Sequence, residues 1–128
     1  MLQLSTPAFL CWNAFWILTM SMKLTIELRA KPDKTQELYQ TLQALLPVIR
    51  GEKGCRDCRV WRDVDDGDVF FLTVDWGAQA NLEQFMPSGN GGALMGAVEL
   101  LSEAARVRFG QDEPWEGIDS LKRMRKKG

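Results

Sequence analysis

The sequence predicts a single α+β domain in which strands and helices follow one another in the order β-α-β-β-α-β. Three segments between residues 23 and 76 alternate apolar and polar side chains, as half-buried strands do. Between and after these segments, apolar residues recur at helical spacing. A chain of 128 residues, 45% of them hydrophobic, suits one domain with one core.

The first strand and the first helix are predicted in residues 23–49. Leu24, Ile26 and Leu28 alternate with polar residues and predict a strand. Lys31-Pro32-Asp33 breaks it, and Asp33 is the expected N-cap of a helix that runs to about Ile49. We expect Pro47 to kink or fray the last turn of this helix. Its buried stripe is Leu38, Leu42, Leu45, Leu46 and Ile49.

The second half of the domain follows the same logic. A strand over 58–64 is expected to close in a tight hairpin at Asp65-Asp66-Gly67-Asp68, and the next strand runs from Val69 to Trp76. Helices are predicted around 81–86 and 93–104, with the flexible run 87–92 between them and a short strand over 106–109. This order predicts a ferredoxin-like antiparallel sheet with helices on one face.

Segments outside residues 22–110 differ in composition. Residues 1–21 carry no charge, and the apolar run of about 13 residues from Ala8 to Met20 is shorter than the roughly 20 that a membrane-spanning helix needs. We interpret this segment as an extension or a misassigned start; a membrane-surface anchor is the alternative. In the tail, 111–128, we expect a loosely packed helix with solvated charges, with a polybasic contact to membrane or nucleic acid as the alternative. Its stripe is Trp115, Ile118, Leu121 and Met124.

Composition excludes several kinds of chemistry. The formal charge of −1 gives no overall field that favours nucleic acid. The three cysteines are too few for a disulfide framework, so we expect a reducing, cytoplasmic setting. The chain has no histidine, and therefore lacks the commonest general base, zinc ligand and proximal haem ligand.

Three local patterns resemble motifs for redox chemistry, calcium binding and phosphate binding, but each departs from its motif. Cys55 and Cys58 have C-x-x-C spacing but enter a strand, so we expect small structural side chains, with a redox pair or half a metal site as alternatives. The aspartates between 63 and 68 do not follow the EF-hand order, and 88–92 lacks the Lys-Ser/Thr of a phosphate loop. No metal site is predicted.

The two faces of the predicted sheet differ in character. One face is apolar and is expected to be the monomer core. The other mixes aromatic side chains with charges of both signs, which is typical of an isologous interface, so we predict a homodimer in which two sheets pack face to face. The interface candidates are Glu27, Trp61, Phe71, Asp75, Arg106 and Arg108.

Four stretches carry a resemblance to a known family: K-L-T-I-E-L-R-A, G-E-K-G-C-R-D-C-R-V-W-R-D-V-D-D, V-D-W-G-A-Q-A-N-L-E-Q-F and A-L-M-G-A-V-E-L-L-S. In this order they resemble the antibiotic biosynthesis monooxygenase domain over residues 22–110. The resemblance implies a dimeric α+β barrel and, in the characterised members, oxygenation of phenols, quinols or polyketide aromatics without a cofactor. Haem-degrading members have a histidine where this sequence has Phe85, which argues against haem here.

The resemblance also implies a pocket between the sheet and the helices. Trp76 corresponds to the family's strand-three tryptophan; its default reading is a core aromatic, and the two roles can coexist. Arg62 and Tyr39 are the candidates for holding a phenolate. The remaining candidates for the lining are Ile26, Leu42, Phe85 and Met95.

The sequence therefore predicts a cofactor-free monooxygenase-like protein that acts on a small aromatic, phenolic or quinol compound with molecular oxygen. A non-catalytic small-molecule-binding or scaffold dimer of the same fold is the alternative. A peripheral membrane protein that uses the N-terminus and the basic tail is a third reading.

Overall fold

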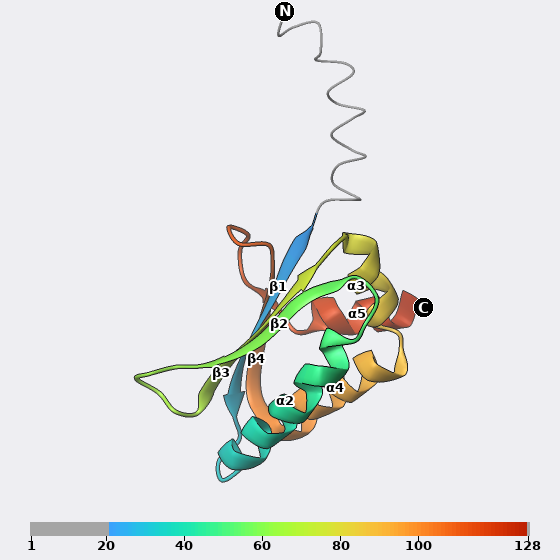
Figure 1. Cartoon of the computed structure of the whole chain (residues 1–128). Helices are drawn as coiled ribbons and strands as arrows, with labels where there is room; N and C mark the ends of the chain where they lie inside the picture. The colour runs from blue at the N-terminus through green and yellow to red at the C-terminus, as the bar shows by residue number, and fades with distance from the viewer. Residues whose placement is uncertain (1–20, 128) are drawn as a thin grey trace, which may run out of the picture.

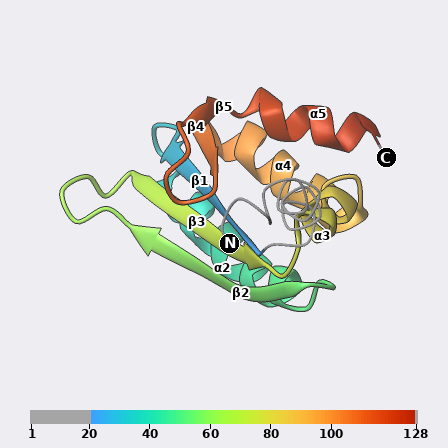
Figure 2. The ribbon, with the colours of Figure 1, turned by 90° about the horizontal axis from the view of Figure 1, so that it is seen from above.

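The computed structural model describes residues 21–127, with side chains as far as Arg125. The sheet has five strands in the order β2-β3-β1-β4-β5, and each described strand pair is antiparallel. The helices gather on one side of it (Figure 1), and β2 and β5 lie at its opposite edges (Figure 2). The predicted α+β, ferredoxin-like fold is confirmed. The elements are β1 (Met22–Ala30), α2 (Thr35–Arg50), β2 (Cys55–Arg62), β3 (Val69–Trp76), α3 (Gln79–Phe85), α4 (Gly89–Leu101), β4 (Ser102–Phe109), β5 (Glu116–Gly117) and α5 (Asp119–Lys127).

The core lies between the helices and the predicted apolar face of the sheet. β1 is central and pairs with β3 on one side and β4 on the other, so that Ile26 lies opposite both Leu72 and Val107. All three side chains are fully buried. Residues directly opposite one another in antiparallel strands project from the same face, which is why the alternation in the sequence assembles one continuous apolar layer.

The helix α2 starts later than the sequence predicts. Asp33 was the expected N-cap, but the helix begins at Thr35 and its N-cap position is Lys34, which makes no side-chain capping bond. Asp33 has φ = 65°, in the left-handed region, whereas an N-cap residue needs an extended backbone. Past Pro47 the helix continues to Arg50, and Gly51 is its C-cap.

The β2–β3 hairpin is longer than the predicted tight turn. β2 ends at Arg62 and β3 begins at Val69, so residues 63–68 form a loop. Acidic side chains bind this loop's own backbone: the Asp66 N–H donates to Asp63 Oδ2 at 2.9 Å. Arg29 of β1 donates to Asp66 Oδ2 at 2.7 Å and so attaches the loop to the sheet.

The predicted flexible run 87–92 is mostly helix. α4 begins at Gly89, and the Ser88 side chain caps it by accepting from the Gly91 N–H at 3.2 Å. Gly91 is buried, and a Cβ there would lie 2.4 Å from the carbonyl oxygens of Phe85 and Met86. Glycine is therefore needed for close packing of the first turn of α4 on the end of α3, and the prediction of a flexible connector is wrong.

The boundary between α4 and β4 is also shifted from the prediction. The helix was expected to reach Ala104, but it ends at Leu101 and the strand begins at Ser102. Ala104 and Ala105 pair with Arg29 and Leu28 of β1. Strand pairing overrides the helix propensity of these alanines.

The C-terminal segment packs on the domain more firmly than predicted. β5 adds to the edge of the sheet beside β4. Leu121 of α5 is completely buried, and Met124 of the same helix and Ile118, just before it, pack against the core cluster. None of the helices between residues 21 and 127 is long and apolar enough to cross a membrane. The predicted extension, residues 1–21, lies outside the described residues except for Ser21.

Candidate functional site

Trp76 is the buried centre of the candidate site. It is the last residue of β3, its side chain is 0% exposed, and its ring lies 5.2 Å from that of Phe85, centroid to centroid. Its indole Nε1 is buried without a hydrogen-bond partner among the described residues. Buried donors are nearly always paired, and an unpaired one costs about 1–3 kcal/mol. The indole N–H is therefore a donor that an acceptor from outside the chain could satisfy.

The predicted aliphatic and thioether residues share this core. Ile26 of β1, Leu42 of α2 and Met95 of α4 belong to the same buried cluster as Trp76 and Phe85. Their exposed fractions are between 0% and 3%. None of these side chains ionises, so the cluster can exclude water and orient an aromatic ring, but it cannot accept a proton.

Tyr39 and Arg62 lie together, but at the other end of β3. The Arg62 guanidinium carbon lies 5.2 Å from the centroid of Phe70 and 6.0 Å from that of Tyr39, and its Nε donates to the Gly67 carbonyl at 2.8 Å. Phe70 precedes Trp76 by six positions, which is about 20 Å along a strand. A small molecule that contacts Trp76 therefore cannot also contact Tyr39 and Arg62. A phenolate-binding role for Tyr39 and Arg62 stays a prediction, and it would concern a second site away from Trp76.

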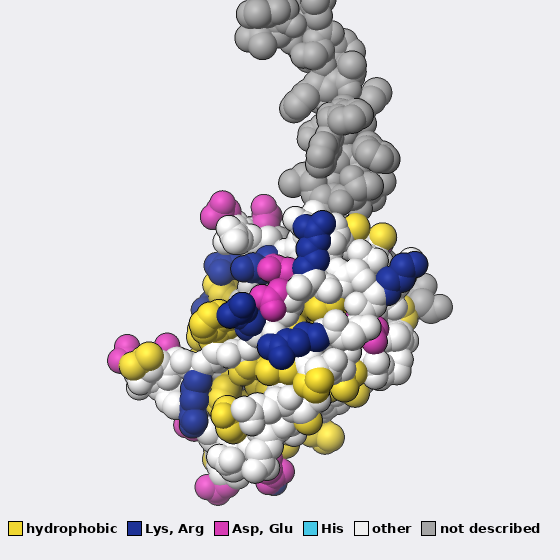
Figure 3. Space-filling view, in the orientation of Figure 1, with side chains coloured by type: hydrophobic (Ala, Val, Ile, Leu, Met, Phe, Trp, Pro, Cys, Tyr) yellow, Lys and Arg dark blue, Asp and Glu magenta, His cyan; other side chains and the backbone are white. Residues whose placement is uncertain are grey.

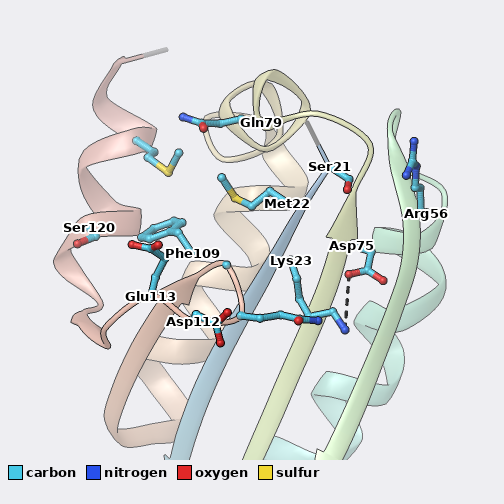
Figure 4. A pocket seen from close by; sticks show the side chains of 13 residues that line it. Ser21, Met22, Lys23, Arg56, Asp75, Gln79, Phe109, Asp112, Glu113 and Ser120 are labelled. Atoms are coloured by element: carbon cyan, nitrogen blue, oxygen red, sulfur yellow. Dashed lines mark ion pairs between the residues drawn. The ribbon is translucent and has the colours of Figure 1, made fainter. Parts of the chain in front are cut away.

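A hollow of about 1000 Å³ opens where β1 begins and β3 and β4 end (Figure 4). No local pattern in the sequence predicts this hollow, because its walls come from distant segments, including the C-terminal one. Met22 and Phe109 reach into it from β1 and β4. The lining residues are Ser21, Met22, Lys23, Arg56, Asp75, Gln79, Phe109, Gly110, Gln111, Asp112, Glu113, Ser120 and Met124.

The strand register connects this hollow to Trp76. Met22 lies directly opposite Trp76 in the β1–β3 ladder, so both side chains project from the core face. Met22 is partly exposed and lines the hollow, whereas Trp76 is fully buried. Directly opposite side chains have Cβ atoms about 5 Å apart. Met22 is thus a neighbour of both the hollow and Trp76, and its thioether side chain is flexible.

Charges of both signs surround the hollow. Lys23 Nζ and Asp75 Oδ1 are 3.8 Å apart, and each side chain is 37% exposed, so this ion pair adds little to stability. Asp112 and Glu113 bring carboxylates from the C-terminal segment. Figure 3 shows basic and acidic side chains intermingled on the visible face of the molecule, as the near-zero net charge predicts.

The interface candidates lie on the face of the sheet that the helices leave uncovered, here called the open face. Trp61 is 52% exposed and Phe71 is half-buried. Arg106 Nη2 donates to Glu27 Oε1 at 2.8 Å, so these two charges pair within the chain. A smaller groove of about 290 Å³ lies on this side, lined by Lys23, Asp57, Arg59, Trp61, Thr73 and Asp75.

The C-terminal segment adds an aromatic side chain to this face. The Trp115 ring centroid lies 4.3 Å from the guanidinium carbon of Arg106 and 4.5 Å from that of Arg108. The spacing of apolar residues predicts Trp115 in a helical stripe, but it lies just before β5, and no local pattern signals its position.

The two described cysteines do not form a redox pair. Both are free, and on a strand residues three apart have Cα atoms about 10 Å apart, beyond the roughly 7 Å that a disulfide allows. Burial raises the pKa of the Cys58 thiol to about 12 and also raises that of Cys55. Their geometry fits small structural side chains. Within residues 21–127, no three His, Cys, Asp or Glu side chains come together as metal ligands.

Comparison with known proteins now assigns the family. The model of the antibiotic biosynthesis monooxygenase family matches residues 21–90, which include β1 to α3. The chain belongs to this family. A comparison with curated proteins finds no match.

Solved structures share the fold at low identity. A protein of Pseudomonas aeruginosa is 22% identical, with a TM-score of 0.65 over 72% of this chain and 93% of its own. One of Mycobacterium tuberculosis is 22% identical, with a TM-score of 0.62 over 73% and 97%. A third, described as an antibiotic biosynthesis monooxygenase, is 17% identical, with a TM-score of 0.64 over 73% and 99%.

Proposed function

We propose that the protein oxygenates a small phenolic or quinol compound with molecular oxygen and without a prosthetic group. The observation that carries this proposal is the buried, unpaired indole N–H of Trp76 beside a hollow of about 1000 Å³. A phenol or quinol oxygen is an acceptor for this N–H, and its ring suits the aromatic and thioether surfaces of Phe85 and Met22.

The reaction needs no outside electron donor. An ionised hydroquinone passes an electron to oxygen, one oxygen atom enters the ring, and the other leaves as water while a hydroxyquinone forms. The protein contributes a dry space, orientation of the ring and a proton acceptor. Asp112 and Glu113, whose carboxylates line the hollow, are the acceptors we propose.

A non-catalytic ligand-binding protein is the second candidate. It is favoured by the cluster around Trp76, in which Ile26, Leu42, Phe85 and Met95 offer no ionisable group. Such a protein would bind the same ring at the same N–H and release it unchanged.

The proposal includes a homodimer formed through the open face of the sheet. Its support is the exposed Trp61, the half-buried Phe71 and the mixture of charges on that face. A reducing, cytoplasmic setting is also part of the proposal, because Cys55 and Cys58 are both free thiols.

Oxygen uptake with hydroquinone tests the proposal. We expect the purified chain to consume oxygen above the spontaneous rate, and Trp76→Phe to reduce this activity because the substrate loses its donor. Trp61→Phe is the matched control, since it changes an exposed tryptophan on the neighbouring strand. Uptake at the spontaneous rate across a panel of hydroquinones and polycyclic phenols would favour the binding protein, and full activity in Trp76→Phe would reduce Trp76 to packing.

A further inference from the structure

The helix α5 lies beyond the residues that the family model matches, yet it contacts the elements around the candidate site. Leu121 is completely buried, and Met124 lines the hollow. Lys122 Nζ lies 3.2 Å from Glu99 Oε2 of α4. This helix is therefore a packed wall of the site.

Arg125 of α5 binds the junction between α3 and α4. Its Nη1 donates to the carbonyl oxygen of Met86 at 2.6 Å and to that of Ser88 at 3.1 Å. The Met86 carbonyl lies at the C-terminal end of α3, where carbonyls lack partners within the helix and a cation complements the helix dipole. The Ser88 carbonyl also accepts from the Gly92 N–H, at 2.9 Å. A Cβ on Gly92 would lie 3.0 Å from the guanidinium, so α4 packs closely against this side chain.

The junction that Arg125 binds also carries Phe85. Phe85 precedes Met86, which is fully buried, and its ring packs on Trp76. A movement of the junction therefore displaces the aromatic surface beside the unpaired indole N–H. We infer that Arg125 is a positioning residue for the candidate site, which acts by holding the α3–α4 junction and Phe85 against Trp76.

The C-terminal helix α5 thus affects how the proposed substrate is held, through the position of Phe85 beside Trp76. A ligand that reaches Trp76 meets the ring of Phe85, whose position depends on the α3–α4 junction. The inference depends on the proposed function for its purpose, but the clamp itself is measurable without turnover.

Amide hydrogen exchange of the full chain tests the clamp. In Arg125→Met we expect the amides of Ser88 and Gly92 to exchange roughly tenfold faster. The Gly92 N–H donates to the Ser88 carbonyl that Arg125 also binds, and the Ser88 N–H donates to the Phe85 carbonyl, next to the Met86 carbonyl that Arg125 binds. We also expect the indole N–H resonance of Trp76 to move. Arg125→Lys should restore part of both effects, since an ammonium group can bind one carbonyl.

Arg123→Met is the matched control, because Arg123 is exposed and its described hydrogen bond goes to Ser120 of the same helix, at 3.2 Å. Exchange at Ser88 and Gly92 that is equal in the Arg125→Met and control proteins, with an unmoved Trp76 resonance, would overturn the inference. Unchanged exchange of Leu72 in β3 shows that the variant is folded.

Hydroquinone kinetics on the same proteins separate this inference from the proposed function. We expect Arg125→Met to raise KM more than it lowers kcat, because a loosened wall weakens binding of the substrate. An inactive parent protein with the expected exchange pattern would refute the proposed function and leave the clamp supported. An active parent protein with no effect of Arg125→Met on exchange or on KM would refute the clamp and leave the function supported.

Discussion

Replacement of Trp76 separates its contribution to packing from that of its unpaired N–H. Trp76→Ala removes a side chain that is 0% exposed, and such truncations of buried aromatics cost about 3–5 kcal/mol of unfolding free energy. For a domain of about 100 residues, 1 kcal/mol shifts the melting temperature by about 4–8 °C. Calorimetry should therefore show a melting temperature at least about 12 °C lower in this variant.

Trp76→Phe has two opposing effects on stability. The smaller ring leaves a cavity, but the substitution also removes a buried donor whose lack of a partner costs about 1–3 kcal/mol. We expect these effects to offset one another to within about 1 kcal/mol, so the melting temperature should change by less than about 8 °C. A loss as large as that in Trp76→Ala would show that the N–H is satisfied in solution, which would refute the reasoning on which the candidate site rests.

Three further predictions concern other parts of the chain. Phe71→Glu places a carboxylate directly opposite Glu27 on the open face of the sheet and should convert the dimer to a monomer in sedimentation; a monomeric parent or an unchanged dimer would refute the face assignment. Burial raises the pKa of Cys58 from 9.0 to about 12, so the folded protein keeps a proton that the unfolded chain loses. This stabilisation is complete below about pH 9 and declines as the pH rises towards 12, and Cys58→Ala should show a shallower alkaline decline of the melting temperature; equal slopes would contradict the assignment. A chain beginning at Met22 should melt within a few degrees of the full chain, and a large loss would show that the N-terminal segment packs on the core.

Most of the sheet could be predicted from the sequence because its two faces differ sharply. Leu24 and Leu28 alternate with polar residues, and the register places them opposite Val74 and Phe70 in the core. A one-residue slip would turn these side chains to the other face, so burial fixes the register. Local pattern and tertiary packing point to the same structure here.

Predictions failed where packing at a distance decides the local conformation. The glycines of residues 89–92 resemble a loop in composition, but Ser88 caps a helix there and Gly91 allows close contact with α3. Ala104 has a high helix propensity but pairs with Arg29 in the sheet. Neither outcome is visible in a local window of the sequence.

The candidate site could be predicted only in part for the same reason. The resemblance to the family pointed to Trp76 and Phe85, and the structure places their rings in contact. The hollow beside them needs Met22, Phe109 and Met124, which come from both ends of the domain and from the C-terminal helix. Only the strand register and the packing of α5 bring these residues together.

We expect an aromatic hydroxyl compound to bind at the Trp76 indole N–H. The most direct test is titration of the ¹⁵N-labelled full chain with hydroquinone under nitrogen, so that no oxygen is consumed. The indole resonances are assigned with single Trp→Phe variants. We predict a saturable shift of the Trp76 resonance while that of the exposed Trp61 stays in place. An unmoved Trp76 resonance at saturating hydroquinone would contradict the claim.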